Sequence, residues 1–252
     1  MNKGFVSLLR REFSGRVWQL WLFFLAAALL PTLVFRLSLR PWHEIASFEE
    51  LYADSAAPVL LAVLFAGLVG WMIWMTLRDF SNGSSCTLLS LPGKRGQLFW
   101  SKAAAYAGAA LMLLAGVIAG ILLSYSLFLL WKDQLARRMA ADYTLDAGLW
   151  LGITRSPLFR LLLPATLPEV CSSLLLLLTL PVWGCYTGWR IAGRRWVRGG
   201  VLSVLTAVCW ALVFRARLAD PLHIQLPGLI VLLALVLLLA ADSLWLLRRG
   251  DL

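Results

Sequence analysis

Residues 78–102 read RDFSNGSSCTLLSLPGKRGQLFWSK, and this polar stretch separates two long apolar runs, residues 57–77 and 103–131. Runs of about 20 apolar residues have the length needed to cross a bilayer. A segment held between two consecutive spans must lie on one side of the membrane. The side on which this stretch lies therefore fixes the orientation of every other predicted span in the bilayer.

The charges of this stretch indicate which side it occupies. It contains one acid and four basic residues, which are Asp79, Arg78, Lys94, Arg95 and Lys102. Because Lys and Arg are enriched in cytoplasmic loops, we expect it to face the cytoplasm. It also has its own apolar segment, residues 86–91, which ends at Pro92. An apolar segment with a basic edge favours contact with another protein.

The composition of the whole chain predicts an all-α, polytopic membrane protein with one domain over residues 1–252. Of its 252 residues, 61% are apolar and 14% are charged, against about 45–50% and about 25% in soluble domains. The remaining apolar runs extend the pattern to six predicted spans. These are residues 17–35, 57–77, 103–131, 170–189, 199–214 and 226–247.

An even number of spans places both termini on the same side, and Arg and Lys at the inner ends predict that this side is the cytoplasm. The net charge of +10 is then mainly a topology signal with some attraction to anionic lipid, and we expect no nucleic-acid partner. Residues 2–16 space Phe5, Leu9 and Phe13 by four, which favours an amphipathic helix on the membrane surface. The alternative is an ordinary basic flank to the first span.

The largest segment outside the spans is predicted to be residues 132–169, on the extracytoplasmic side. Its first part is compatible with a helix. Its last part, residues 156–169, is apolar but contains Pro157, Pro164 and Pro168. That pattern favours a short interfacial or re-entrant helix over a continuous span. Residues 41–56 form a second, acidic outer loop.

The residue types that commonly catalyse reactions do not form a recognisable catalytic motif in this sequence. Gly93 and Lys94 are followed by Arg95 rather than Ser or Thr, and position 88 is leucine, so the chain lacks a phosphate-binding loop. The only histidines, His43 and His223, lie in predicted outer loops, where neither has a serine or a zinc-ligand set beside it. We predict that the chain is not an enzyme and binds no metal or cofactor.

Two acids are the candidates for a transport path, because ionisable residues in membranes often serve transport: Asp242 within the predicted sixth span, and Glu169 at the outer start of the fourth. Both lie near the ends of their spans. We therefore favour a simpler interpretation, in which Asp242 pairs with a basic residue at the inner end and Glu169 is solvated.

Small, aromatic and sulfur-containing residues suggest how the helices pack. The pairs Gly116/Gly120 and Gly184/Gly188 have the spacing that permits close helix contact, and we expect them to pack within the subunit, with a dimer contact as the alternative. Five tryptophans at inner ends are interpreted as interfacial anchors: Trp71, Trp74, Trp100, Trp189 and Trp245. The four cysteines are interpreted as reduced thiols: Cys86, Cys171, Cys185 and Cys209.

The six spans, the amphipathic N-terminus and the pattern R-D-x(3)-G-x(4)-L-L-S-L-P-x-x-R-x-x-L-x-x-x-K resemble the ABC-2 type permeases. These are the membrane subunits of ATP-binding-cassette exporters. The matching positions are Arg78, Asp79, Gly83, Leu88, Leu89, Ser90, Leu91, Pro92, Arg95, Leu98 and Lys102. The architecture covers nearly the whole chain, whereas the motif covers only this loop.

The resemblance implies that residues 81–91 dock on a separate ATPase subunit. Residues expected at that contact are Arg78, Asp79, Ser81, Gly83, Leu88, Leu89, Leu91, Pro92, Lys94 and Arg95. Two permease subunits, identical or paralogous, and two ATPases holding ATP and Mg would form the working unit in a bacterial inner membrane. One departure is that the connection 215–225 is short, whereas many family members place re-entrant helices there.

The substrate is not specified by these residues. The short chain and small outer loops look most like permeases of antimicrobial-peptide export and immunity systems, while lipid-linked or cell-envelope compounds, drugs and ions are alternatives. Two other functions are also open. One is a self-contained carrier or channel driven by an ion gradient, and the other is a non-transporting scaffold or sensor subunit of an ABC complex.

Overall fold

The computed structural model describes residues 3–39, 47–82, 95–139, 155–162, 166–193, 196–219 and 226–249. Within these ranges the regular structure is entirely α-helical, and six helices are long and apolar enough to cross a membrane. The predicted all-α fold with six spans is therefore confirmed. The spanning helices are α2 (Val17–Ser38), α4 (Ala57–Ser81), α6 (Arg95–Met139), α9 (Leu167–Ala192), α10 (Trp196–Ala219) and α11 (Leu226–Arg249).

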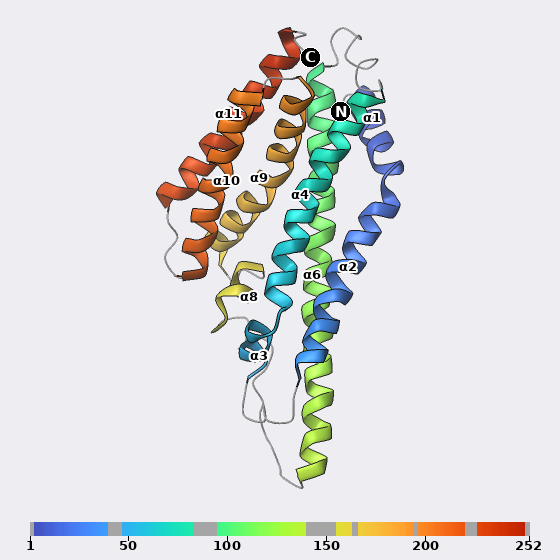
Figure 1. Ribbon diagram of the computed structural model, residues 1–252, viewed down its shortest axis with the longest axis vertical. Helices are drawn as coiled ribbons and strands as arrows, with labels where there is room; N and C mark the ends of the chain where they lie inside the picture. The colour runs from blue at the N-terminus through green and yellow to red at the C-terminus, as the bar shows by residue number, and fades with distance from the viewer. Residues whose placement is uncertain are drawn as a thin grey trace.

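The spans run alternately up and down, so α1 (Lys3–Ser14) and the C-terminal end of α11 lie at the same end of the bundle (Figure 1). We call this the α1 end. The C-terminal end of α4 and the N-terminal end of α6 also lie at the α1 end. Helix α2 packs along α6, and α9 lies between α4 and the pair α10 and α11.

Helix α6 is longer than its predicted span, 103–131. It has 45 residues, and at 1.5 Å per residue this is about 68 Å, more than twice the roughly 30 Å of hydrocarbon. Its C-terminal part projects beyond the other spans in Figure 1. The apolar run in the sequence, residues 103–131, indicated only the membrane-spanning part of α6. Residues 132–139 continue the helix because Lys, Gln, Leu and Arg are good helix formers in water.

The close contact between α2 and α6 depends on two glycines. A Cβ atom at Gly116 would lie 2.5 Å from the carbonyl oxygen of Phe24, and one at Gly120 would lie 2.9 Å from the carbonyl oxygens of Ala27 and Ala28. The hydroxyl of Thr32 on α2 also donates to Gly120 O at 3.0 Å, which joins a side chain of α2 to the backbone of α6. The expected packing of this pair within the subunit is confirmed.

The pair Gly184/Gly188 has the same role on α9. A Cβ atom at Gly184 would lie 2.9 Å from Met72 Cβ, and one at Gly188 would lie 2.6 Å from Thr76 Cβ, both on α4. Small residues thus bring the backbones of α4 and α9 together, as in other membrane helix pairs. The expected packing within the subunit is confirmed here too.

Two short helices close the opposite end of the bundle. These are α3 (Phe48–Asp54), within the stretch expected to be a loop, and α8 (Pro157–Leu162), within the segment expected to hold a short helix. Phe48 stacks on Phe159 with ring centroids 5.6 Å apart, and Tyr52 packs on both rings. Burial raises the pKa of Tyr52 to about 12. Helix α3 begins with a capping box formed by Ser47 and Glu50, which explains its position in the sequence.

The tryptophan prediction is wrong for Trp189. Its side chain is fully buried and packs edge-on against Phe80 and Phe99, because α9 lies inside the bundle at this level. Trp74, Trp100 and Trp245 are exposed, as interfacial anchors require, whereas Trp71 packs on Phe23 and Tyr106. The described cysteines are free thiols, buried at Cys185, partly buried at Cys209 and exposed at Cys171; Cys86 lies outside the described residues.

We expect Gly116→Ala to lower the free energy of unfolding by about 1–3 kcal/mol, the usual cost of overpacking. The added methyl group would collide with backbone of α2 rather than with a flexible side chain. Gly67→Ala on α4 is the matched control, since no atom lies within 4 Å of its added Cβ, and it should stabilise α4 by up to about 1 kcal/mol. Thermal unfolding in detergent measures both. A Gly116→Ala variant that melts at or above the parent temperature would contradict the packing described.

Candidate functional site

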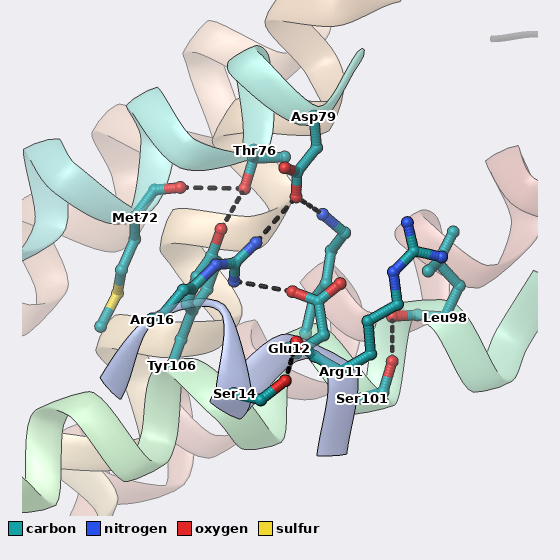
Figure 2. A network of polar contacts seen from close by, with 11 residues as sticks. Arg11, Glu12, Ser14, Arg16, Met72, Thr76, Asp79, Leu98, Ser101 and Tyr106 are labelled. Carbon is teal, nitrogen blue, oxygen red and sulfur yellow. Dashed lines mark hydrogen bonds and ion pairs between the residues drawn. The ribbon is translucent and has the colours of Figure 1, made fainter. Parts of the chain in front are cut away.

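An ionic cluster joins three helices at the α1 end (Figure 2). Asp79, near the C-terminal end of α4, is its centre. Its Oδ2 atom accepts a hydrogen bond of 2.9 Å from Nη2 of Arg16 and another from Nζ of Lys102 on α6. One carboxylate thus holds a cation from the α1–α2 turn and a cation from α6.

Arg16 extends the cluster to α1. Its Nη1 atom lies 2.7 Å from Oε2 of Glu12 in an ion pair, and its guanidinium lies over the ring of Tyr106, 5.5 Å from the centroid. These four charged side chains, Glu12, Arg16, Asp79 and Lys102, sum to zero. A balanced cluster of this kind can be held out of water at a lower cost than an isolated charge.

The surroundings of the cluster are largely dry. Lys102 is 1% exposed and the other three charged side chains are between 10% and 22% exposed. Tyr106 is fully buried, and its hydroxyl lies 3.0 Å from Thr76 Oγ1, which donates to Met72 O. Ion pairs act more strongly in such a low-dielectric setting than at a wet surface. The cluster therefore fixes α4 and α6 relative to each other.

Helix α1 is held on the bundle by a second contact. A Cβ atom at Gly108 of α6 would lie 2.6 Å from Cζ of Phe13, so the ring of Phe13 rests directly on α6. Arg10 and Arg11 lie on the exposed side of α1. The predicted amphipathic helix is confirmed, with its apolar stripe turned partly to protein.

Residues 83–94 are connected to the cluster at both ends. Asp79 precedes them by four residues and Lys102 follows them by eight. The Asp79–Lys102 pair consequently joins α4 and α6, the two helices between which the segment lies in the chain, and Arg16 joins this pair to the α1–α2 turn.

Few of the residues expected to contact an ATPase are described. Arg78 is exposed and its guanidinium lies 5.5 Å from the ring centroid of Trp74. Ser81 is exposed and donates to Arg78 O, whereas Asp79 points into the cluster (Figure 2). Arg95 begins α6, and its side chain lies outside the described residues. The others also lie outside them: Gly83, Leu88, Leu89, Leu91, Pro92 and Lys94.

Asp242, the first candidate for a transport path, lies in a second buried ion pair. Its Oδ2 atom accepts hydrogen bonds from Arg190 and, at 3.0 Å, from the hydroxyl of Tyr186. Arg190 is 3% exposed and Asp242 is 9% exposed. This confirms the predicted pairing of Asp242 with a basic residue and joins α9 to α11.

Glu169, the second candidate, is not solvated as expected. It is 3% exposed, and its Oε1 atom lies 2.5 Å from Nη2 of Arg160 on α8. Its other oxygen accepts from the backbone N–H of Thr166 in a capping box. The prediction was wrong because the sequence does not reveal that α8 folds back over the start of α9.

Sequence reasoning missed Arg16 as a partner of Asp79 and Arg160 as the partner of Glu169. It also missed the pairing of Glu12 with Arg16. Glu12 and Arg16 have the i,i+4 spacing typical of helical ion pairs, which was a usable signal, but nothing local linked them to Asp79. Lys102 was recognised only as a motif position. No group of three or more His, Cys, Asp or Glu side chains gathers at one place in the described part of the chain.

No protein-family model, curated protein sequence or solved structure matches this chain. The cluster connects α1, α4 and α6 through ion pairs between charged side chains.

We expect Lys102→Met to lower the free energy of unfolding by about 3–5 kcal/mol, because it removes the buried cation of the pair and leaves the partly buried carboxylate of Asp79 one cation short. Arg137→Met is the matched control. Arg137 pairs with Asp133 on the same helix, but the two side chains are 79% and 56% exposed, so its loss should cost less than about 1 kcal/mol. Thermal unfolding in one detergent compares them. Equal losses in the two variants would show that the cluster does not hold α4 and α6 together.

Proposed function

We propose that this chain is the membrane subunit of an ATP-binding-cassette exporter, and that residues 83–94 receive movement from a separate ATPase subunit. The observation that carries the proposal is the Asp79–Lys102 pair at the base of this segment, with Arg16 joining it to α1. Six membrane-spanning helices are consistent with a membrane transport protein. The motif in residues 78–102 supports the finer assignment.

In the proposed mechanism, ATP and Mg bind to two ATPase subunits, which close and displace residues 83–94 of two permease subunits. Because Asp79 and Lys102 are paired, α4 and α6 are pulled together rather than separately. Helix α4 is packed on α9 through Gly184 and Gly188, and α6 is packed on α2 through Gly116 and Gly120. The displacement therefore spreads to other spans as a rigid-body motion between two states.

The proposed substrate of the exporter is an antimicrobial peptide or another amphipathic, lipid-like compound. The chain resembles permeases of antimicrobial-peptide export and immunity systems in its short length and small outer loops. The proposed setting is a bacterial inner membrane with residues 83–94 in the cytoplasm, as the basic residues of 78–102 favour. The permeases pair with each other or with a paralogue.

The direct test is affinity purification of the chain from its native membrane, followed by mass spectrometry. We expect an ATPase subunit with a phosphate-binding loop to co-purify in a stoichiometric amount, encoded by a neighbouring gene. Replacing Leu88 and Leu89 by Gln, or Lys94 and Arg95 by Glu, should release this subunit or abolish transport while ATP hydrolysis continues, because apolar and basic contacts are removed from the docking segment.

The matched control reverses charge at the same end of the bundle but leaves the sequence of residues 83–94 unchanged. Arg10→Glu/Arg11→Glu alters two exposed basic residues of α1 and should keep the ATPase bound. Co-purification and transport that are unchanged in the loop variants would contradict the docking role. An ATPase that co-purifies without substrate-dependent transport would identify a scaffold or sensor subunit instead.

The alternative of an ion-driven carrier or channel predicts a different result for Asp242. A carrier would transport as the purified chain alone in liposomes, and Asp242→Asn would abolish that transport. Because Asp242 is already bonded to Arg190 and Tyr186, we expect no ion-driven flux in the parent chain. We expect Asp242→Asn to lower thermal stability instead, by leaving Arg190 without its anion. A proton-driven flux measured with a pH-sensitive dye, present in the parent and lost in the variant, would favour the carrier.

A further inference from the structure

The side of α1 that is turned away from the bundle is basic. Arg10 and Arg11 are exposed, and so are Val6 and Ser14. Residues three or four positions apart share one side of a helix, so Arg10 lies beside Val6 and Arg11 lies beside Ser14. The opposite side of α1 rests on α6 through the ring of Phe13.

The charges of these two arginines are not neutralised inside the protein. Neither Arg10 nor Arg11 forms an ion pair with a residue in the described ranges. The two acids of the neighbouring ionic cluster are already engaged, since Glu12 pairs with Arg16 and Asp79 pairs with Arg16 and Lys102. Helix α1 therefore presents two positive charges to its surroundings.

Helix α1 lies at the level of the membrane surface. The spanning helix α2 begins at Val17, directly after the α1–α2 turn, and Trp18 and Trp21 at its start are 77% and 49% exposed. Exposed tryptophans at the end of a span mark the headgroup region of a bilayer. Near the C-terminal end of α4, exposed Trp74 also lies under the guanidinium of Arg78. The surroundings of α1 are therefore phospholipid headgroups.

We propose that Arg10 and Arg11 bind the phosphate groups of anionic phospholipids in the leaflet at the α1 end. Arginine suits phosphate because its planar fork offers two N–H groups to two oxygens. In a zwitterionic lipid the cationic headgroup cancels the charge of the phosphate, whereas an anionic lipid keeps a net negative charge that attracts basic residues. The lipid holds α1 from the exposed side, and Arg16 holds it from the side of the bundle.

An acidic protein surface would also attract these arginines, but the exposed side of α1 favours lipid. Val6, beside Arg10, is 37% exposed, and an apolar side chain next to a basic one is typical of helices that lie in the headgroup region. The stem of an arginine can follow the apolar boundary while its guanidinium reaches a phosphate. The site does not depend on an ATPase partner, so its test and the test of the exporter proposal can succeed or fail separately.

The experiment uses the purified full-length chain in phosphatidylcholine nanodiscs. Phosphatidylglycerol with a photoreactive diazirine close to its headgroup is the probe, and an equal amount of phosphatidylcholine with the same label is the comparison. Cross-linked peptides are mapped by mass spectrometry. We expect α1 to be labelled about twentyfold more by phosphatidylglycerol, from about fivefold for each arginine near an anionic surface. The preference should decrease as salt screens the charges.

Two variants assign the preference to its residues. Arg10→Gln/Arg11→Gln should abolish the preference of α1 for phosphatidylglycerol. It should also melt close to the parent temperature in phosphatidylcholine nanodiscs, because both side chains are exposed. Arg36→Gln is the matched control. Arg36 is an exposed arginine at the other end of α2, and its replacement should leave the labelling of α1 unchanged.

Three results would overturn the proposal. One is equal labelling of α1 by the two lipids in the parent chain. Another is a preference for phosphatidylglycerol that persists in Arg10→Gln/Arg11→Gln, which would place its source elsewhere. The third is that cross-linking in the native membrane joins α1 to an acidic segment of another protein and yields no lipid adduct, which would identify a protein as the occupant of this surface.

Discussion

The absence of water from the hydrocarbon core is the constraint on which this structure depends. Backbone N–H and C=O groups there must be satisfied within the protein, so each spanning segment is a helix. The same constraint applies to side chains. Buried Lys102 pairs with Asp79 on another helix, and buried Arg190 pairs with Asp242 on another helix. Pairing of charges and pairing of backbone groups thus follow from one cause.

Because lipid is as apolar as leucine, burial of hydrocarbon does not by itself drive these helices together. Close packing and polar contacts do so instead. Gly116 and Gly120 allow α2 to rest its backbone on α6, and Thr32 adds a hydroxyl contact between them. The ionic contacts occur near helix ends, where long cationic side chains reach across to a neighbour. Glycines therefore set the distances between helices along their length, and ion pairs fix their ends.

The two ends of the bundle are fixed in different ways. At the α1 end, two acidic and two basic side chains join α1, α4 and α6. At the other end, Phe48, Tyr52 and Phe159 pack together, and Arg160 pairs with Glu169. Charged side chains thus connect the helices at the first end, and aromatic packing with one ion pair connects them at the second.

The sequence by itself determined the number of spans, the amphipathic N-terminal helix and the position of the polar segment between the second and third spans. These features depend on local hydropathy and periodicity, which neighbouring residues carry. It also indicated that Asp242 would have a basic partner, although not which one. Only the tertiary structure decided that Asp79 holds Arg16 and Lys102, that Trp189 is buried, and that Glu169 lies under α8. Those outcomes depend on which helices become neighbours. Packing between residues far apart in the chain, such as Gly188 and Thr76, determines which helices become neighbours. The periodicity of residues within one helix does not encode its neighbours.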